Sequence, residues 1–296
     1  MSKLKVRAIL TFLSCVCFLT VSEISISAEI SAELEANILR RIERRFFPGL
    51  IIGIVDEQGS RYYGYGEVAL KGEIKPDKDT VYEIGSITKT FTATLLADMV
   101  LKGELGLNDP VQVFLPNSVE IPQRNGDQIS LVDLSTHHSA LPRMPSNFSP
   151  ENQFNPYADY TVQNMYDFLS GHTLTRDIGE RGEYSNLGVG LLGHALMLKA
   201  GTDYEELVSE RIFRPLSMGS SGITFSDSMS ERLAPAYAAN GGILFSVENW
   251  DLPTFAGAGA IRSTAEDMLQ YLAANIGLLD SPLISAMELA QQPRED

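Results

Sequence analysis

Apolar residues recur every three or four positions in several stretches of the chain, the spacing of helices with one buried face. The first of these stretches, Ser31–Phe46, is ended by Pro48 and Gly49. A second begins at the segment around Ser86 and runs to Gly103. Further helices are predicted over Thr161–Leu169, over Ser185–Lys199 with Gly201 placed to end it, over Tyr204–Phe213, and from a capping box Ser263-Thr264-Ala265-Glu266 to about Ala274.

Strand patterns concentrate near the N-terminus. Leu50–Val55 and Arg61–Leu70 are rich in β-branched and aromatic residues, and Asp56-Glu57-Gln58-Gly59 joins them, which predicts a β-hairpin. From about residue 104 to 250, short helical segments alternate with loops rich in Pro, Asn, Ser and Gly. The pattern predicts an α/β (α+β) fold with an α/β layer at the N-terminus and a mainly helical insertion.

Residues 1–28 have the pattern of a secretory signal peptide. A basic start is followed by the uncharged apolar run Ala8–Val21, and small residues end the segment at Ser27-Ala28. The alternative, a membrane anchor, is disfavoured because the run is short for a bilayer span. The sequence therefore predicts export, to the periplasm or the extracellular space. Cys15 and Cys17 both lie in this segment, so the mature chain is expected to lack disulfides, thiol chemistry and lipidation.

The charge balance restricts the partners. The formal net charge is −15, which argues against nucleic acid and anionic membranes as partners, and a soluble acidic surface is sufficient to explain it. The four histidines, His137, His138, His172 and His194, show no metal-binding spacing, so no metal or other cofactor is expected. Oligomeric state does not follow from the sequence.

Two short motifs carry candidate chemistry. Ser86 and Lys89 are three residues apart at the start of a predicted helix, which places a hydroxyl and an amine on one helix face, as a Ser/Lys acyl-transfer enzyme requires. The spacing alone is weak evidence, since Ser2 and Lys5 share it. Tyr184-Ser185-Asn186 follows a glycine-rich loop and opens a helix, so it is either a second site motif or an ordinary helix cap.

Four longer segments, some of which contain these motifs, occur along the chain in the same order as similar segments of a known superfamily. Glu83–Pro116, Leu134–Pro142, Tyr184–Gly188 and Gly257–Leu269 resemble segments of the serine β-lactamase and penicillin-binding-protein superfamily. The likeness is greatest to the branch that holds class C β-lactamases, D-Ala carboxypeptidases and related esterases. It implies a β-lactamase/transpeptidase-like fold, in which helices and a mainly helical insertion flank an antiparallel sheet.

The resemblance also implies a role for each motif residue. Ser86 would be the nucleophile, Lys89 would accept or relay its proton, and Tyr184 would protonate the leaving group and help activate the deacylating water. Asn186 would hold Lys89 and bind the substrate.

Lys and Tyr have ordinary pKa values of about 10, so either acts as a base at neutral pH only if the two perturb each other. Which of the two holds the proton stays open. His137 matches a structural element of the family. Trp250 could line the cleft, but burial is the favoured expectation.

One part of the family pattern is missing. No Lys or His is followed by Ser/Thr-Gly, the third motif that supplies a cation and lines the cleft. We therefore expect a signal peptide (residues 1–28) and a β-lactamase-related domain (29–296) whose C-terminal strands are absent. Its parts are an α/β part (29–80), a mainly helical part (81–255) and an incomplete C-terminal part (256–296).

The functional expectation follows from the motifs present and the one absent. We expect an exported serine hydrolase whose most favoured activity is β-lactam hydrolysis. D-Ala-D-Ala carboxypeptidase activity and small-ester esterase activity are the alternatives. A catalytically impaired fragment, or a protein that binds peptidoglycan peptides, is the alternative of another class.

Overall fold

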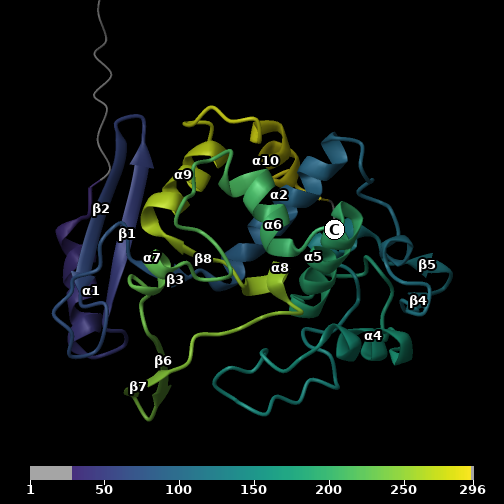
Figure 1. Ribbon diagram of the computed structural model, residues 1–296, viewed down its shortest axis with the longest axis horizontal. Coiled ribbons are helices and arrows are strands. Elements are labelled where there is room, and N and C mark those ends of the chain that lie inside the picture. Colours follow the sequence, from purple (N-terminus) through teal and green to yellow (C-terminus); the bar gives the residue numbers. More distant parts are fainter. Residues whose placement is uncertain (1–28, 295–296) are drawn as a thin grey trace, which may run out of the picture.

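The computed structural model describes residues 29–294 (Figure 1). The predicted signal peptide, residues 1–28 with both cysteines, lies outside the described residues. No helix within residues 29–294 combines the length and the apolar character needed to cross a bilayer.

The chain begins with a helix and a β-hairpin that lie together at one end of the molecule (Figure 1). Helix α1 (Ala32–Glu43) is capped by Ser31, whose Oγ accepts the N–H of Leu34 at 3.2 Å. Strands β1 (Gly49–Asp56) and β2 (Gly59–Gly66) pair in antiparallel register. The predicted helix and hairpin are confirmed, with β2 ending at Gly66 rather than at Leu70.

The middle of the chain is mainly helical, as its sequence pattern predicts. Its helices are α2 (Thr88–Leu101), α3 (Leu131–Ser135), α4 (Val162–Gly171), α5 (Asn186–Ala200) and α6 (Tyr204–Val208), with short turns η1 (Gly85–Ile87), η2 (Val111–Phe114) and η3 (Ser209–Phe213) and a small hairpin of β4 (Gln123–Arg124) and β5 (Asp127–Gln128). Gly201 ends α5 in the left-handed conformation at φ 73°, as predicted. The helix predicted over Tyr204–Phe213 is divided, since α6 passes into a wider π-helical turn at Ser209.

The last part of the chain returns to the hairpin and to the middle helices. It contains α7 (Asp227–Ser230), β6 (Ala236–Asn240), β7 (Ile243–Val247), α8 (Ala256–Gly259), β8 (Arg262–Thr264), α9 (Ala265–Asn275) and α10 (Ile284–Ala290). The capping box predicted at Ser263 is wrong by one residue. Thr264 caps α9 by accepting the N–H of Asp267 at 3.2 Å, because Ser263 lies in strand β8, where its hydroxyl contacts that of Ser221 at 2.7 Å.

The strands are antiparallel, and with the helices they confirm the expected fold class. They form two-stranded sheets rather than the one sheet expected, with β3 (Val81–Glu83) paired to β8 and β6 paired to β7. A largely apolar cavity of about 570 Å³ lies between the β1–β2 hairpin and the β3–β8 pair, against α9. Ile51, Tyr82 and Leu269 are among its lining residues.

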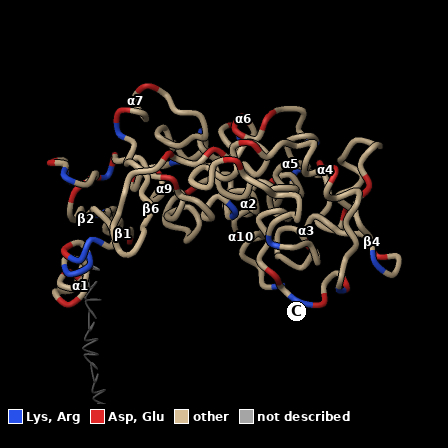
Figure 2. Tube along the Cα trace, turned by 90° about the horizontal axis from the view of Figure 1, so that it is seen from below, with Lys and Arg blue, Asp and Glu red and all other residues tan. Residues whose placement is uncertain are grey.

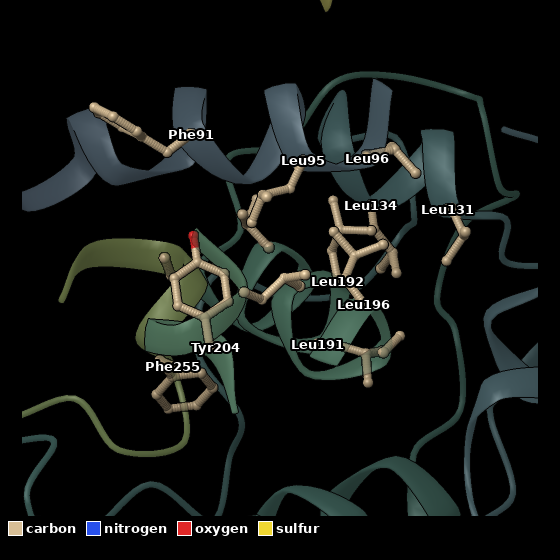
Figure 3. Close-up of a cluster of buried hydrophobic side chains, with 14 of the residues drawn as sticks. Phe91, Leu95, Leu96, Leu131, Leu134, Leu191, Leu192, Leu196, Tyr204 and Phe255 are labelled. Carbon is tan, nitrogen blue, oxygen red and sulfur yellow. The ribbon is translucent and has the colours of Figure 1, made fainter. Parts of the chain in front are cut away.

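The main core lies between α2 and α5 (Figure 3). Leu95 of α2 and Leu192 of α5 project into the space between the two helices and are fully buried (Figure 3). Each such side chain contributes about 1.5–3 kcal/mol through burial. Phe255, which precedes α8, is also fully buried and stacks on Tyr160 at 5.1 Å between ring centroids. This core fixes the two helices whose N-termini carry the candidate motifs.

Charged positions are spread over the surface loops and the ends of elements, with acidic residues more numerous than basic ones (Figure 2). The excess of carboxylates makes any unpaired cation near a candidate site informative.

Candidate active site

Ser86 is presented to solvent by a sharp turn between a strand and a helix. Strand β3 ends at Glu83, and Gly85 adopts φ +51°, a left-handed conformation that a residue with a side chain seldom takes. The helical turn η1 then begins, and α2 continues from it. The backbone N–H of Ser86 thus lies at the start of a helical segment, where N–H groups lack partners within the helix and face an approaching acceptor.

Lys89 lies one turn further on, beside Ser86. Its Nζ is 3.2 Å from Ser86 Oγ and donates to the carbonyl oxygen of Ala258, in α8, at 2.6 Å. Nearby bonds hold α2 against the α8 segment. Thr92 Oγ1 donates to Gly257 O at 2.7 Å, and Thr88 Oγ1 accepts the N–H of Ile261 at 3.2 Å. The contacts of Thr88 and Thr92, which precede and follow Lys89 in α2, therefore fix the position of the lysine.

Tyr184 is brought to this pair by the start of α5. Ser185 caps α5 by accepting the N–H of Gly188 at 2.8 Å, and its hydroxyl donates to the carbonyl of Pro142 at 2.7 Å. The Tyr184 ring, 37% exposed, lies with its centroid 4.8 Å from Lys89 Nζ. The structure thus brings together the three residues predicted as catalytic, although Ser86 and Tyr184 are nearly a hundred positions apart in the sequence.

The electrostatics of the group favour a base at neutral pH. Burial lowers the pKa of Lys89 below its ordinary value, and this effect outweighs the opposing influence of Tyr184. Burial alone raises the pKa of Tyr184, but its hydrogen-bonding interactions with Lys89 and Ser86 and the nearby positive charges bring that pKa below its ordinary value. Lys89 and Tyr184 therefore titrate as a coupled pair, both shifted toward neutral pH.

His137 supports the tyrosine from the other side. Its ring lies 4.6 Å from the Tyr184 ring, and its Nδ1 accepts the N–H of Ser185 at 3.2 Å. An accepting Nδ1 carries no proton, and burial and the charge of Lys89 lower the pKa of this histidine. His137 is thus neutral and fixes the loop-to-helix junction that carries Tyr184, as its match to a structural element implies.

The structure places Asn186 differently from the expectation. The described hydrogen bonds of Lys89 go to Ser86 and Ala258 rather than to Asn186. The Asn186 side chain instead donates to Tyr157 Oη at 3.4 Å and to Met144 Sδ at 3.8 Å. Its Oδ1 is buried and has no hydrogen-bond partner within residues 29–294. The carbonyl of Ala258 provides the support that was expected from Asn186.

A cavity of about 90 Å³ lies beside Ser86, which forms part of its wall. Asn186, Tyr157 and Trp250 are among its lining residues. Trp250 is 43% exposed, so the prediction that it is buried is wrong. Its indole N–H donates to the carbonyl of Phe154 at 2.8 Å, which fixes the ring at the cavity wall. Tyr157 lies outside every sequence motif, and Ala258 lies in the segment Gly257–Leu269 without having been predicted as a site residue; the tertiary arrangement identifies both.

Chemically, the group holds what an acyl-transfer reaction requires on the nucleophile side. A serine hydroxyl and a helix-start N–H lie at the wall of a small cavity, and a coupled pair of bases lies beside the hydroxyl. Among the residues given, no Lys or His is followed by Ser/Thr-Gly.

Comparison with known proteins gives consistent matches. The family model described as Beta-lactamase matches residues 34–296. The D-alanyl-D-alanine-carboxypeptidase/endopeptidase AmpH of Escherichia coli (strain K12) is 31% identical over 224 residues, which are 76% of this chain and 56% of that protein. A beta-lactamase of the same organism is 26% identical over 285 residues, 94% of this chain and 71% of the relative. The chain thus spans little more than half the length of AmpH.

A solved structure shows the same fold at the level of the backbone. A class C beta lactamase from Rhodobacter sphaeroides superposes with a TM-score of 0.73 at 27% identity, covering 87% of this chain and 69% of that one.

Proposed function

The chain belongs to the Beta-lactamase family, and from that premise we propose that it is an exported serine hydrolase that forms an acyl-enzyme at Ser86. The observation that carries the proposal is the contact of Lys89 Nζ with Ser86 Oγ at 3.2 Å, beneath the Tyr184 ring. An amine with a lowered pKa beside a serine hydroxyl is the arrangement that activates serine without histidine.

The reaction proceeds in two steps. Ser86 Oγ attacks the carbonyl carbon of an amide, its proton passes to the Lys89/Tyr184 pair, and the carbon–nitrogen bond breaks as that pair returns a proton to the nitrogen. Water, deprotonated by the same pair, then attacks the ester at Ser86. Hydrolysis releases a carboxylic acid and restores the serine hydroxyl. Asn186, whose Oδ1 lies buried and unpartnered beside the cavity, is placed to accept an N–H of the substrate.

For the substrate we propose a β-lactam first, since the relatives named beta-lactamase match up to 94% of the chain. The second candidate, a peptide ending in D-Ala-D-Ala, is favoured by AmpH, the relative at 31% identity. A small ester is the third candidate substrate, since Ser86 would attack its carbonyl carbon in the same way. A non-catalytic protein that binds peptidoglycan peptides is the alternative of another class, motivated by the missing third motif.

Covalent labelling tests the proposal. A fluorescent penicillin is expected to attach to the wild-type chain and not to Ser86→Ala, with the attachment located by mass spectrometry of the peptide containing Ser86. Equal labelling of both forms, or none of the wild type, would contradict an acyl-enzyme at Ser86. Comparing turnover of a chromogenic cephalosporin, a D-Ala-D-Ala peptide and a p-nitrophenyl ester then ranks the substrate classes.

The proposal of export rests on the sequence of residues 1–28. Detection of a mature chain that begins after Ala28 in the medium or the periplasm would support it.

A further inference from the structure

Four arginines near the end of α1 form a basic cluster without ion-pair partners. Arg40, Arg41, Arg44 and Arg45 occupy four of six consecutive positions, and all four side chains are exposed. Within residues 29–294 no carboxylate lies at ion-pair distance from any of them. The chain has 38 acidic and 23 basic residues, so this local excess of arginine departs from its general charge. Figure 2 shows the basic run along α1, at one end of the molecule.

The backbone at the end of α1 provides a second observation. Arg45 adopts φ 56°, the left-handed conformation in which helices usually place glycine, because a residue with a side chain is strained there. Arg40 and Arg44 lie four residues apart on one helix face, where like charges repel each other. One or two cations in the last turn would be enough to complement the helix dipole. Helix stability therefore does not account for four arginines, one of them at a position that favours glycine.

An exposed aromatic side chain lies beside the arginines. Phe46 follows the cluster and is 62% exposed, and its N–H donates to the carbonyl of Arg41 at 3.0 Å, which holds it against the last turn of α1. The inward face of the helix is formed instead by Ile38, which is buried, and by Ile42, whose Cδ1 lies beside Gly66 of β2. The Phe46 ring is thus left available to an apolar environment outside the protein.

The combination of cations and an exposed ring favours a membrane over a soluble polyanion. Guanidinium groups bind phosphates through paired hydrogen bonds, and both kinds of partner provide phosphates. Only a membrane also provides an apolar layer beneath its phosphates, in which an aromatic side chain is stabilised.

The net charge of the whole chain disfavours an anionic membrane, but salt limits the range of that repulsion. At 0.1 M ionic strength, exposed charges more than about 10 Å apart are largely screened from each other. Glu43 is the one carboxylate among residues 40–45, and Glu33 and Glu35 lie in the first turn of α1, at its opposite end. Because α1 lies at one end of the molecule (Figure 1), the cluster can approach a surface while the acidic positions of the middle helices stay distant from it.

We propose that Arg40, Arg41, Arg44, Arg45 and Phe46 (the α1 patch) form a peripheral membrane-binding site that recognises anionic phospholipids. The arginines contact the headgroup phosphates, and the Phe46 ring enters the layer below them. The patch thereby attaches the chain to a membrane surface with no helix that crosses the bilayer. This attachment does not depend on the proposed acylation, and helices α4 and α5 lie at the other end of the molecule (Figure 1).

Cosedimentation with phospholipid vesicles tests the site. The measurement uses residues 29–296, the expected mature chain, because the apolar run Ala8–Val21 would bind lipid independently of α1. The wild type is expected to bind vesicles of phosphatidylcholine with about one-third phosphatidylglycerol, less strongly as salt is added, and not to bind vesicles of phosphatidylcholine alone. Arg40→Gln/Arg44→Gln is expected to lower the partition coefficient by about 10- to 30-fold. Phe46→Ala is expected to lower it by about 5- to 20-fold.

A matched control removes two charges elsewhere. Arg181→Gln/Arg214→Gln replaces two exposed arginines that lie near glutamates outside the α1 patch, and it is expected to bind vesicles like the wild type. Urea denaturation checks that each variant is folded. Absence of wild-type binding to the anionic vesicles, or equal weakening in the two double variants, would overturn the proposal.

Two further measurements separate this inference from its alternatives. Equal binding of polyphosphate by the wild type and Phe46→Ala, without binding to vesicles, would assign the arginines to a soluble polyanion and overturn the membrane site. Penicillin labelling at Ser86 is expected to be the same in Arg40→Gln/Arg44→Gln as in the wild type. Loss of vesicle binding and loss of acylation are therefore observed independently, so failure of either proposal leaves the other standing.

Discussion

The side-chain nitrogen of Lys89, in the first turn of α2, lies 3.2 Å from Oγ of Ser86, in the turn η1 that precedes this helix. The contact joins a nucleophile to an amine whose burial disfavours its charged form. Each of the next two predictions concerns how this pair moves a proton.

Replacing Lys89→Gln removes the amine and keeps a polar side chain. We expect acylation by a fluorescent penicillin to slow by about 10²- to 10⁴-fold, the usual contribution of a positioned base. Stopped reactions analysed by mass spectrometry give the rate. Lys199→Gln, an exposed lysine of α5, is the control and should acylate like the wild type. Acylation of Lys89→Gln within threefold of wild type would exclude Lys89 as the base.

The pH dependence of acylation reports the coupled pair. The base reacts when unprotonated, so the rate rises with pH, and the lowered pKa values of Lys89 and Tyr184 place this rise below the ordinary values near 10. Tyr184 itself acts to raise the pKa of Lys89, against the larger effect of burial. Tyr184→Phe is therefore expected to move the rise to lower pH and to lower the maximal rate. A rise that stays in place or moves to higher pH would contradict the coupling.

Close packing of α5 on the segment before α8 predicts a stability effect. A Cβ added at Gly190 would lie 2.4 Å from Cδ1 of Phe255 and 3.3 Å from its Cα. Phe255 is fully buried and cannot swing aside. Gly190→Ala is expected to lower the free energy of unfolding by about 1–3 kcal/mol, measured by urea denaturation. Gly171→Ala, with no heavy atom within 4 Å of the added carbon, is the control and should be no less stable than wild type.

Acid should weaken the fold through its buried histidines. Burial lowers the pKa of His194 below 6.5, and it lowers those of His137 and His172 as well. The unfolded chain then binds protons that the folded chain does not, so stability is fully present above pH 6.5 and falls as pH decreases below it. We expect the free energy of unfolding to decline from pH 7.5 to 5.5.

His194→Gln is expected to make this decline shallower. His194 is chosen because its Nε2 contacts Tyr166 Oη at 2.6 Å, away from the candidate site. Urea denaturation at several pH values measures the slope. An unchanged or steeper slope in the variant would assign the acid sensitivity to other groups.

The sequence pattern predicted local structure best where it is set by neighbours along the chain. The hairpin Gly49–Gly66 follows from alternating strand residues and a turn, and the end of α5 follows from Gly201. The start of α9 was misplaced by one residue because Ser263 and Thr264 are both good caps. Pairing of β8 with β3, a contact between distant segments, decided between them.

Only the residues of the candidate site that belong to the two short motifs could be predicted from the sequence. Ser86, Lys89 and Tyr184 converge as expected, but the acceptor for Lys89 is a backbone carbonyl, and every residue has one. No composition or spacing singles out Ala258, nor the exposed indole of Trp250.

The carbonyl of Ala258 has one more effect on the lysine. A neutral amine has two N–H bonds and one lone pair, and it rotates freely about its last carbon–nitrogen bond unless something holds it. Donation of one N–H to Ala258 O at 2.6 Å stops that rotation. The remaining N–H and the lone pair then occupy the other two positions on the nitrogen, which lies 3.2 Å from Ser86 Oγ. The backbone of α8 thus limits the orientations from which the amine can remove the hydroxyl proton.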